Sequence, residues 1–264
     1  MSENSVAKLI VPVLQTFRPI TLAEMDNVQL LNRMDTKFVF PVDKLIPFLE
    51  KIKNGYRLLE TNPLRYADYN SLYYDTPDSK LYFTHHRGKS GRYKIRFRSY
   101  NDTKMFFLEI KHKNNKGRTD KSRKRKELIE QTLTPESIEF INKKTTLDAT
   151  KLEAKLQVEF SRLTFVNNEE NERATIDFNL RFSHNGKQVG LPGIVVAEIK
   201  QSKFSVKSGA ISALRELKIR EDNMSKYCIG SALIYPHLKH NNFKPKLHTI
   251  NKLQNDGITR NKAA

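Results

Sequence analysis

The sequence predicts an α+β protein in which an antiparallel β-sheet closes into a tunnel, a closed barrel with a polar, cationic lumen flanked by helices. Three observations predict this fold class. Several segments alternate between apolar and ionisable residues, as strands with two different faces do. Many of the ionisable positions are basic, and the chain carries a formal net charge of +18. Helix-start and helix-stop patterns occur between the strands and after them.

The clearest strand pair spans residues 92–113, with a short turn at Asn101–Lys104. Because successive side chains of a strand point to opposite faces, each strand of this hairpin has one apolar and one charged face. Solvent on the charged side is the usual explanation for one such hairpin. The charged face carries Lys94, Arg96, Arg98, Glu109 and Lys111.

The same alternation returns in three later segments, which makes a shared polar face more probable than solvent alone. Glu159 alternates with apolar neighbours in residues 156–161, and Glu198 does so in residues 195–200. In residues 173–182 the polar positions oppose a continuous apolar set. These polar positions are Arg173, Thr175, Asp177, Asn179 and Arg181.

Residues 1–24 are expected to form an N-terminal arm or first helix, with a capping-box pattern from Thr21 to Glu24. The segment 31–40 is expected to be the first strand, with Arg33, Asp35 and Lys37 on one face. A helix is predicted over residues 44–53, ended by Asn54 and Gly55. Residues 70–76 are predicted to form a strand that runs into a proline turn.

The second half of the chain contains a basic segment and several helical patterns. Residues 114–126 are densely basic; in a strand, Lys121 and Arg123 would share the face of the hairpin cations. Thr134 and Pro135 predict a helix start, with the helix running to about Lys144. Helical patterns cover parts of residues 211–235. We expect a tunnel domain over residues 25–237 and a basic, disordered tail over residues 238–264.

Composition restricts the class of protein and of partner. The hydrophobic content of 38% is enough for a sizeable core, and a single cysteine, Cys228, rules out an intrachain disulfide. The sequence shows no signal peptide and no run of roughly 20 apolar residues that would cross a bilayer. A cytoplasmic protein is therefore expected. Its strongly basic charge indicates a polyanionic partner.

The cationic strand faces favour closure of the sheet. A flat sheet with dense rows of cations would suffer mutual repulsion, whereas closure removes exposed edges and brings the ionisable faces together around a lumen. Such a lumen would be neutralised by bound phosphates and a divalent metal ion.

Nine short segments in order resemble the VTC domain, the polyphosphate polymerase domain of the vacuolar transporter chaperone complex and its bacterial relatives. This family lies in the triphosphate tunnel metalloenzyme (CYTH-like) superfamily, and the resemblance covers about residues 25–235. Each segment is weak alone, but their order is specific. The segments are 33–37 (RMDTK), 71–77 (SLYYDTP), 94–98 (KIRFR), 107–111 (FLEIK), 121–123 (KSR), 158–162 (VEFSR), 173–177 (RATID), 197–200 (AEIK) and 225–227 (SKY).

The resemblance implies a set of site residues. Glu198 would bind Mn²⁺ or Mg²⁺, and Glu109, Glu159 and Asp177 would be further metal ligands or partners of the cations. Asp35 stands where the superfamily's paired-glutamate motif has a glutamate, which favours the polymerase branch over the hydrolases. The phosphate-binding residues would be Lys37, Arg96, Arg98, Lys111, Lys121, Arg123, Arg173 and Lys226, and the catalytic ones among them Lys37, Arg96, Arg98, Lys111, Arg173 and Lys226.

The function implied by the resemblance is transfer of the γ-phosphoryl group of ATP to a growing polyphosphate chain, with release of ADP. A triphosphatase of the same architecture is one alternative, and a non-catalytic module that binds polyphosphate or RNA is another. Nucleic acid is not expected as a specific ligand, because the aromatic residues do not share a strand face with the cations as base-stacking platforms require. Coupling to transport would need a separate membrane protein, which would hold the protein at the inner face of a membrane.

Overall fold

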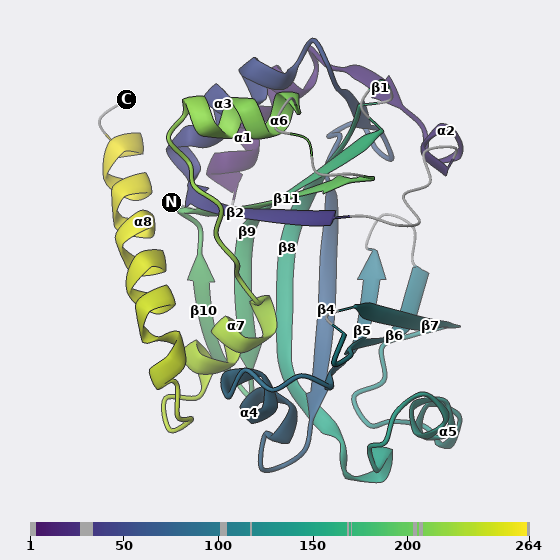
Figure 1. Ribbon diagram of the computed structural model, residues 1–264. Coiled ribbons are helices and arrows are strands. Elements are labelled where there is room, and N and C mark those ends of the chain that lie inside the picture. Colours follow the sequence, from purple (N-terminus) through teal and green to yellow (C-terminus); the bar gives the residue numbers. More distant parts are fainter. Residues whose placement is uncertain are drawn as a thin grey trace.

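The computed structural model describes residues 4–26, 34–100, 105–116, 118–167, 169, 171–202, 205 and 208–262. One sheet contains all of the described strands, and its main path runs β2-β11-β9-β8-β4-β5-β6-β7 (Figure 1). Every neighbouring pair on this path is antiparallel. An α+β fold with a large antiparallel sheet is therefore confirmed.

The strands are β1 (Arg18–Ile20), β2 (Met34–Pro41), β3 (Arg57–Leu59), β4 (Ala67–Asp75), β5 (Arg92–Tyr100), β6 (Met105–Lys113), β7 (Thr119–Lys126), β8 (Glu153–Asn167), β9 (Glu172–His184), β10 (Lys187–Leu191) and β11 (Ile194–Gln201). The helices are α1 (Asn4–Leu14), α2 (Leu22–Asp26), α3 (Leu45–Ile52), α4 (Lys80–His86), α5 (Pro135–Lys144), α6 (Gly209–Glu216), α7 (Lys226–Ile234) and α8 (Lys244–Lys262). Short 3₁₀ turns are η1 (Val42–Lys44), η2 (Ala149–Lys151) and η3 (Asn241–Phe243). Arg33 and the predicted turn at Asn101–Lys104 lie outside the described residues.

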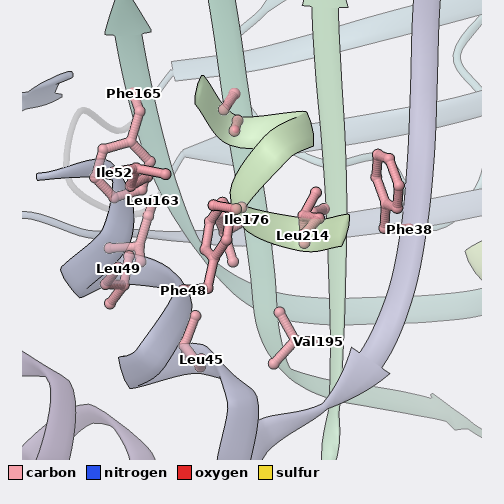
Figure 2. Packing of buried hydrophobic residues seen from close by; sticks show 14 of the residues in the cluster. Phe38, Leu45, Phe48, Leu49, Ile52, Leu163, Phe165, Ile176, Val195 and Leu214 are labelled. Carbon is pink, nitrogen blue, oxygen red and sulfur yellow. The ribbon is translucent and has the colours of Figure 1, made fainter. Parts of the chain in front are cut away.

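Alternation along the strands separates two faces of the sheet, which we name the outer and the inner face. On the outer face, Phe38, Ile176 and Val195 pack against α3 and α6 (Figure 2). Further along the same face, Phe97 and Leu108 belong to a second core that includes residues of α5. The inner face carries the ionisable residues of these strands.

The predicted helix starts at Thr21 and Thr134 are confirmed. The Thr21 backbone N–H donates to Glu24 at 2.9 Å while the Glu24 N–H donates to the Thr21 hydroxyl at 3.3 Å, which is a capping box. The Thr134 hydroxyl accepts a hydrogen bond from the Ser137 N–H at the start of α5.

Helix α7 packs on the inner face, against β8 and β9. The Ser225 hydroxyl caps it by accepting from the Cys228 N–H. A Cβ atom at Gly230 would lie 2.3 Å from the Phe182 ring, so only glycine lets α7 approach the sheet this closely. Helices α4 and α7 both lie at the end where β5 begins (Figure 1).

The sheet is strongly curved but is not closed by hydrogen bonds, which corrects the predicted closed barrel. The two ends of its main path are β2 and β7, and no pairing joins them in the described part of the chain. The free edge of β2 is covered instead by the segment before α7, where the Asp222 N–H donates to the Lys37 carbonyl at 2.8 Å. The curvature brings β2 and β11 across in front of β8 and β4 (Figure 1).

Strand β9 does not keep one polar face along its length, contrary to the sequence prediction. Two of its residues, Asn179 and Leu180, stand opposite the single residue Phe160 of β8, which defines a β-bulge. Asn179 has a φ of 54°, a left-handed conformation that asparagine tolerates better than most residues. Beyond the bulge the faces are exchanged, so that Leu180 belongs to the core around α7 and Arg181 lies on the outer face.

The C-terminal segment is not disordered, which corrects the expected tail. Residues 244–262 form helix α8, which contacts β2, β11 and η1 and runs along one side of the molecule (Figure 1). Ile250 is 1% exposed, and Leu247 and Leu253 pack against the same core. These three residues are spaced three positions apart and form a short apolar stripe on an otherwise basic helix. So short a stripe is difficult to recognise in the sequence.

Candidate active site

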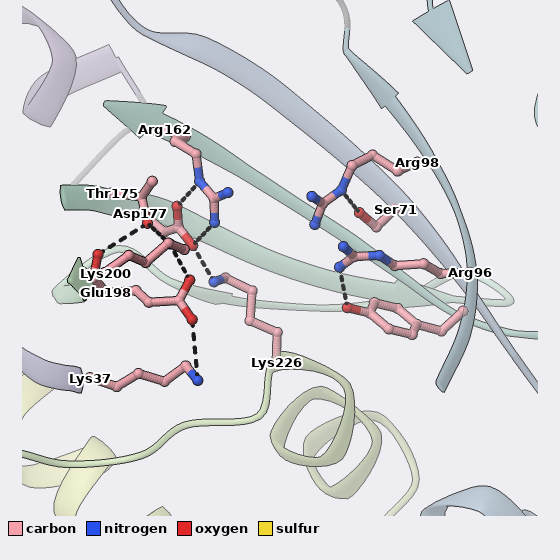
Figure 3. Close-up of polar contacts among 11 residues, drawn as sticks. Lys37, Ser71, Arg96, Arg98, Arg162, Thr175, Asp177, Glu198, Lys200 and Lys226 are labelled. Atoms are coloured by element: carbon pink, nitrogen blue, oxygen red, sulfur yellow. Dashed lines mark hydrogen bonds and ion pairs between the residues drawn. The ribbon is translucent and has the colours of Figure 1, made fainter. Parts of the chain in front are cut away.

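Asp177 lies at the centre of the inner face and holds two cations from different elements. Its carboxylate accepts from Arg162 Nε at 2.5 Å and Nη2 at 2.7 Å, a two-point contact between neighbouring strands β8 and β9 (Figure 3). Lys226, the first residue of α7, donates to the same carboxylate. Burial raises the pKa of Asp177, but Arg162 and Lys226 outweigh it and hold the pKa well below its usual range. Asp177 therefore carries its negative charge at neutral pH, and Arg162 carries its positive charge.

Glu198 on β11 lies between two lysines. Its carboxylate is 3.2 Å from Lys37 Nζ and 2.6 Å from Lys200 Nζ (Figure 3). Lys200 also donates to the Thr175 hydroxyl at 3.3 Å. Burial raises the pKa of Glu198, yet Lys200 and Lys37 hold it well below its usual range. This carboxylate is consequently a permanent anion next to cations from β2 and β11.

Arg96 forms the third charged group of the inner face, on the opposite side of the lumen. Its guanidinium donates to Glu109 at 2.6 and 2.7 Å and to the Tyr73 hydroxyl at 2.9 Å. Burial raises the pKa of Glu109, but the cations Arg96, Arg98 and Lys111 lower it to about 2.

The depressed pKa of Glu109 makes folding sensitive to acid. Its pKa is lower in the folded protein than the ordinary 4.5, so its contribution is present above about pH 4.5 and is lost as the pH falls towards 2. We expect this one group to remove about 3 kcal/mol from the free energy of unfolding over that interval. Denaturant unfolding of wild type and Glu109→Gln at several pH values checks this.

The Glu109→Gln protein should show a shallower pH dependence than wild type in that range. The matched control is Glu216→Gln, which removes a carboxylate that is 61% exposed. Equal slopes for wild type and Glu109→Gln would contradict the assignment.

Strands β5 and β6 carry more cations than their carboxylates can neutralise. Arg98 is 9% exposed, and it donates a long hydrogen bond of 3.5 Å to the Ser71 hydroxyl. Lys111 has no carboxylate within ion-pair distance among the residues that the structure describes. The neighbouring Arg96, together with burial, lowers the pKa of Lys111 well below its usual value. Lys94 is held by the Ser225 hydroxyl at 3.0 Å, so this region has a surplus of positive charge.

Three further predicted phosphate-binding residues also lie on the inner face. Lys121 pairs with Lys111 and Arg123 with Glu109 in the β6–β7 register, which places both on the inner face. Arg173 shares the inner face of β9 with Thr175 and Asp177, at the register position of Lys200. The residues that the structure brings to this one face are Lys37, Arg96, Arg98, Glu109, Lys111, Lys121, Arg123, Arg173, Asp177, Glu198 and Lys226.

Glu159 does not belong to the site, which corrects its prediction as a weaker metal ligand. It pairs in register with Asn70 and Arg181, and its carboxylate is 3.7 Å from Arg181 on the outer face. Strand parity explains the error. The inner-face residues of β8 are Phe160 and Arg162, so the apolar set that was expected to face outward lines the inner side instead.

The sequence prediction missed four polar or aromatic side chains of the inner face. Arg162 and Lys200 belong to segments that carry the family resemblance, and Lys200 follows the predicted site residue Glu198 by two positions on β11. Tyr69 and Tyr73 also point inward, because they alternate with outward residues of β4. Aromatic side chains therefore do share the cationic face, and the sequence-based argument against base stacking was wrong.

The carboxylates fit a metal ion only together with a substrate. Among the described residues, no group of three or more His, Cys, Asp or Glu side chains could hold a metal. Glu198 and the neighbouring strand position Asp35 offer few oxygen ligands. Mg²⁺ is commonly bound by one or two carboxylates together with waters and substrate phosphates, and Glu198 fits that kind of ligand set.

The antiparallel sheet curves around a cationic inner face, and the arginine and lysine donors of this face are of the kind that suits phosphate groups. A sequence model of the VTC domain matches residues 32–235, which is more than half of the chain. The chain therefore belongs to the VTC domain family. A comparison with curated proteins yields no match.

Several solved structures resemble this chain at low sequence identity. HpAC1 from Hippeastrum, described as a proposed adenylyl cyclase with a dominant triphosphatase activity, has 14% sequence identity and a TM-score of 0.50, covering 79% of this chain and 100% of that chain. The PH1819 protein from Pyrococcus horikoshii has 14% identity and a TM-score of 0.42, covering 74% of this chain and 97% of that chain. A proposed adenylate cyclase from Bacillus halodurans has 13% identity and a TM-score of 0.44, covering 74% and 96%.

Among the residues that the structure describes, no helix is both long enough and apolar enough to cross a bilayer.

Proposed function

We propose that this protein is a polyphosphate polymerase, which transfers the γ-phosphoryl group of ATP to a growing polyphosphate chain and releases ADP. The observation that carries the proposal is the surplus of buried cations on β5 and β6. Arg98 and Lys111 are desolvated without a carboxylate partner in the described part of the chain, and like charges lower the pKa of Lys111. Bound phosphate groups would relieve this repulsion.

An extended ligand suits the arrangement better than a single phosphate. Cations recur along β5 at every second residue, which spaces Lys94, Arg96 and Arg98 about 7 Å apart. The row continues across β6 and β7 through Lys111, Lys121 and Arg123. A linear chain of phosphates presents its negative charges along a similar line.

In the proposed reaction the terminal phosphate oxygen of the chain attacks the γ-phosphorus, and the bond to the β–γ bridging oxygen of ATP breaks. Arginines such as Arg96 and Arg98 would bind phosphate oxygens at two points, and Lys37 and Lys111 would supply compact charge. The cofactor would be Mn²⁺ or Mg²⁺ held by Glu198, and it would neutralise charge on the phosphates. Lys226 lies on the inner side of Asp177, where it would contact the transferred group.

Product analysis tests the proposal. The purified protein, given ATP and Mn²⁺, should yield long phosphate polymer on a gel and release one ADP for each phosphate incorporated. A chelated sample serves as the control and should yield neither. Orthophosphate as the only phosphate product would overturn the polymerase assignment, and so would tight polyphosphate binding without nucleotide turnover.

A triphosphatase is the second candidate, because the same cations would bind a triphosphate with water as the acceptor. The similarity of fold to HpAC1, described with a dominant triphosphatase activity, favours it. The two activities share the donor and differ in the acceptor. The ratio of polymer to orthophosphate in the same assay separates them.

A further inference from the structure

A band of aromatic side chains crosses four neighbouring strands on the inner face. Phe107 of β6, Tyr100 of β5, Tyr69 of β4 and Phe160 of β8 follow one another across the sheet. Their ring centroids are 6.1 Å apart for Phe107 and Tyr100, 4.9 Å for Tyr100 and Tyr69, and 5.1 Å for Tyr69 and Phe160. We call these four residues the aromatic band. It is continuous from β6 to β8.

Guanidinium groups of the site lie over these rings. Arg98 is 5.2 Å from the Tyr69 centroid, and Arg123 is 5.1 Å from the Phe107 centroid. Arg162 lies 4.9 Å from Tyr69. Planar groups that carry positive charge are thus interleaved with aromatic faces, as in sites that bind single-stranded nucleotides through stacking and phosphate contacts.

The rings of the aromatic band differ in what covers their faces. Phe160 is 4% exposed and Tyr69 is enclosed between Phe160, Tyr100 and two arginines, so neither ring offers a free face. Tyr100 and Phe107 are half-buried. They lie at the end of the β5–β6 pair away from α4 and α7, which close the other end (Figure 1).

We propose that Tyr100 and Phe107 stack the base of the nucleoside triphosphate whose phosphates occupy Arg98, Arg96 and Lys111. Arg98 lies directly opposite Phe107 in register, and Tyr100 is two residues beyond it. A nucleotide with its phosphates on the cations and its base on these rings spans Arg96 to Tyr100, about 13 Å along the strand. The inference rests on the proposed function only for the position of the phosphates.

The ligand is a free nucleotide rather than a nucleic acid, because the half-buried rings of Tyr100 and Phe107 adjoin the surplus cations of Arg98 and Lys111. Stacking is tolerant of sequence but stronger for larger bases. The site should therefore bind adenosine nucleotides more tightly than uridine nucleotides.

Binding of ADP and of pyrophosphate, measured by calorimetry, tests the proposal without phosphoryl transfer. We expect Tyr100→Leu and Phe107→Leu each to weaken ADP binding about tenfold while pyrophosphate binding stays unchanged. The preference for ADP over UDP should shrink in the same variants. Unchanged pyrophosphate binding also shows that the variants are folded. A failure of the polymerase assay leaves this measurement interpretable, since neither ligand is a donor.

Phe106→Leu is the matched control, because Phe106 precedes Phe107 on β6 and faces the outer side. It should change neither affinity. Equal weakening of ADP and pyrophosphate would overturn the proposal, since the rings would then act only by supporting the arginines. Unchanged ADP binding would also overturn it, as would tighter binding of a short oligoadenylate than of ADP through the same two rings.

Discussion

Replacing Asp177 by asparagine is expected to lower the free energy of unfolding by about 3–5 kcal/mol, the largest loss of stability for any single site residue. Asp177 is the buried carboxylate that holds both Arg162 and Lys226. The amide keeps the shape but removes the charge, so that two desolvated cations face each other. Denaturant unfolding at neutral pH measures the loss.

Added anion should partly restore this variant. Tripolyphosphate is expected to raise the melting temperature of Asp177→Asn by more than that of wild type, because phosphate oxygens replace the missing carboxylate. Glu159→Gln is the control: this half-exposed outer-face carboxylate lies 3.7 Å from Arg181, and its loss should cost less than about 1 kcal/mol. A loss below about 1 kcal/mol for Asp177→Asn would contradict the role of the triad.

Lys111→Met is expected to have the opposite effect on stability and the largest effect on activity. Turnover of ATP should fall about 100-fold, because one preorganised cation of the phosphate site is lost. The free energy of unfolding should rise by about 1 kcal/mol, because methionine fills similar space without repelling Arg96 and Arg98. Activity and unfolding measured on the same preparation check both parts.

The stability difference between Lys111→Met and wild type should depend on pH. The pKa of Lys111 is lowered by folding, so its cost to stability is complete below the folded pKa and shrinks as the pH rises through it. The advantage of the methionine variant should therefore shrink at alkaline pH. Lys113→Met, an exposed position two residues further along β6, should alter neither property. Loss of stability in Lys111→Met would show that Lys111 has a partner that holds it.

Strand alternation was sufficient to predict most of the inner face. Arg96, Lys111 and Glu198 lie on regular strands, where the direction of a side chain depends only on its parity. The helix starts at Thr21 and Thr134 were also predictable, because capping depends on residues three positions apart. These properties are local, and a single sequence contains them.

The prediction errors arose where the face that a side chain points to depends on more than local alternation along the strand. The bulge at Asn179 could not be seen from alternation, since Arg181 continues the polar pattern of Asp177 without interruption. Glu159 was misplaced for a related reason, because the core around α7 packs on the inner face and attracts the apolar residues of β8. Helix α8 depends on contacts with β2 and β11, which no local pattern reports.

The bulge in β9 has a mechanical consequence for the chain. Asn179 changes which side chains of β9 face inward. Before it, the odd-numbered residues lie on the inner face with the ionisable groups; after it, the even-numbered residues lie on that face and pack in the core around α7. If the strand kept all its residues without the bulge, regular alternation would turn Arg181 to the inner face, toward the apolar core that contains Phe182. A single asparagine in the left-handed conformation thus lets one strand present ionisable side chains in its first half and apolar side chains that pack against α7 in its second half.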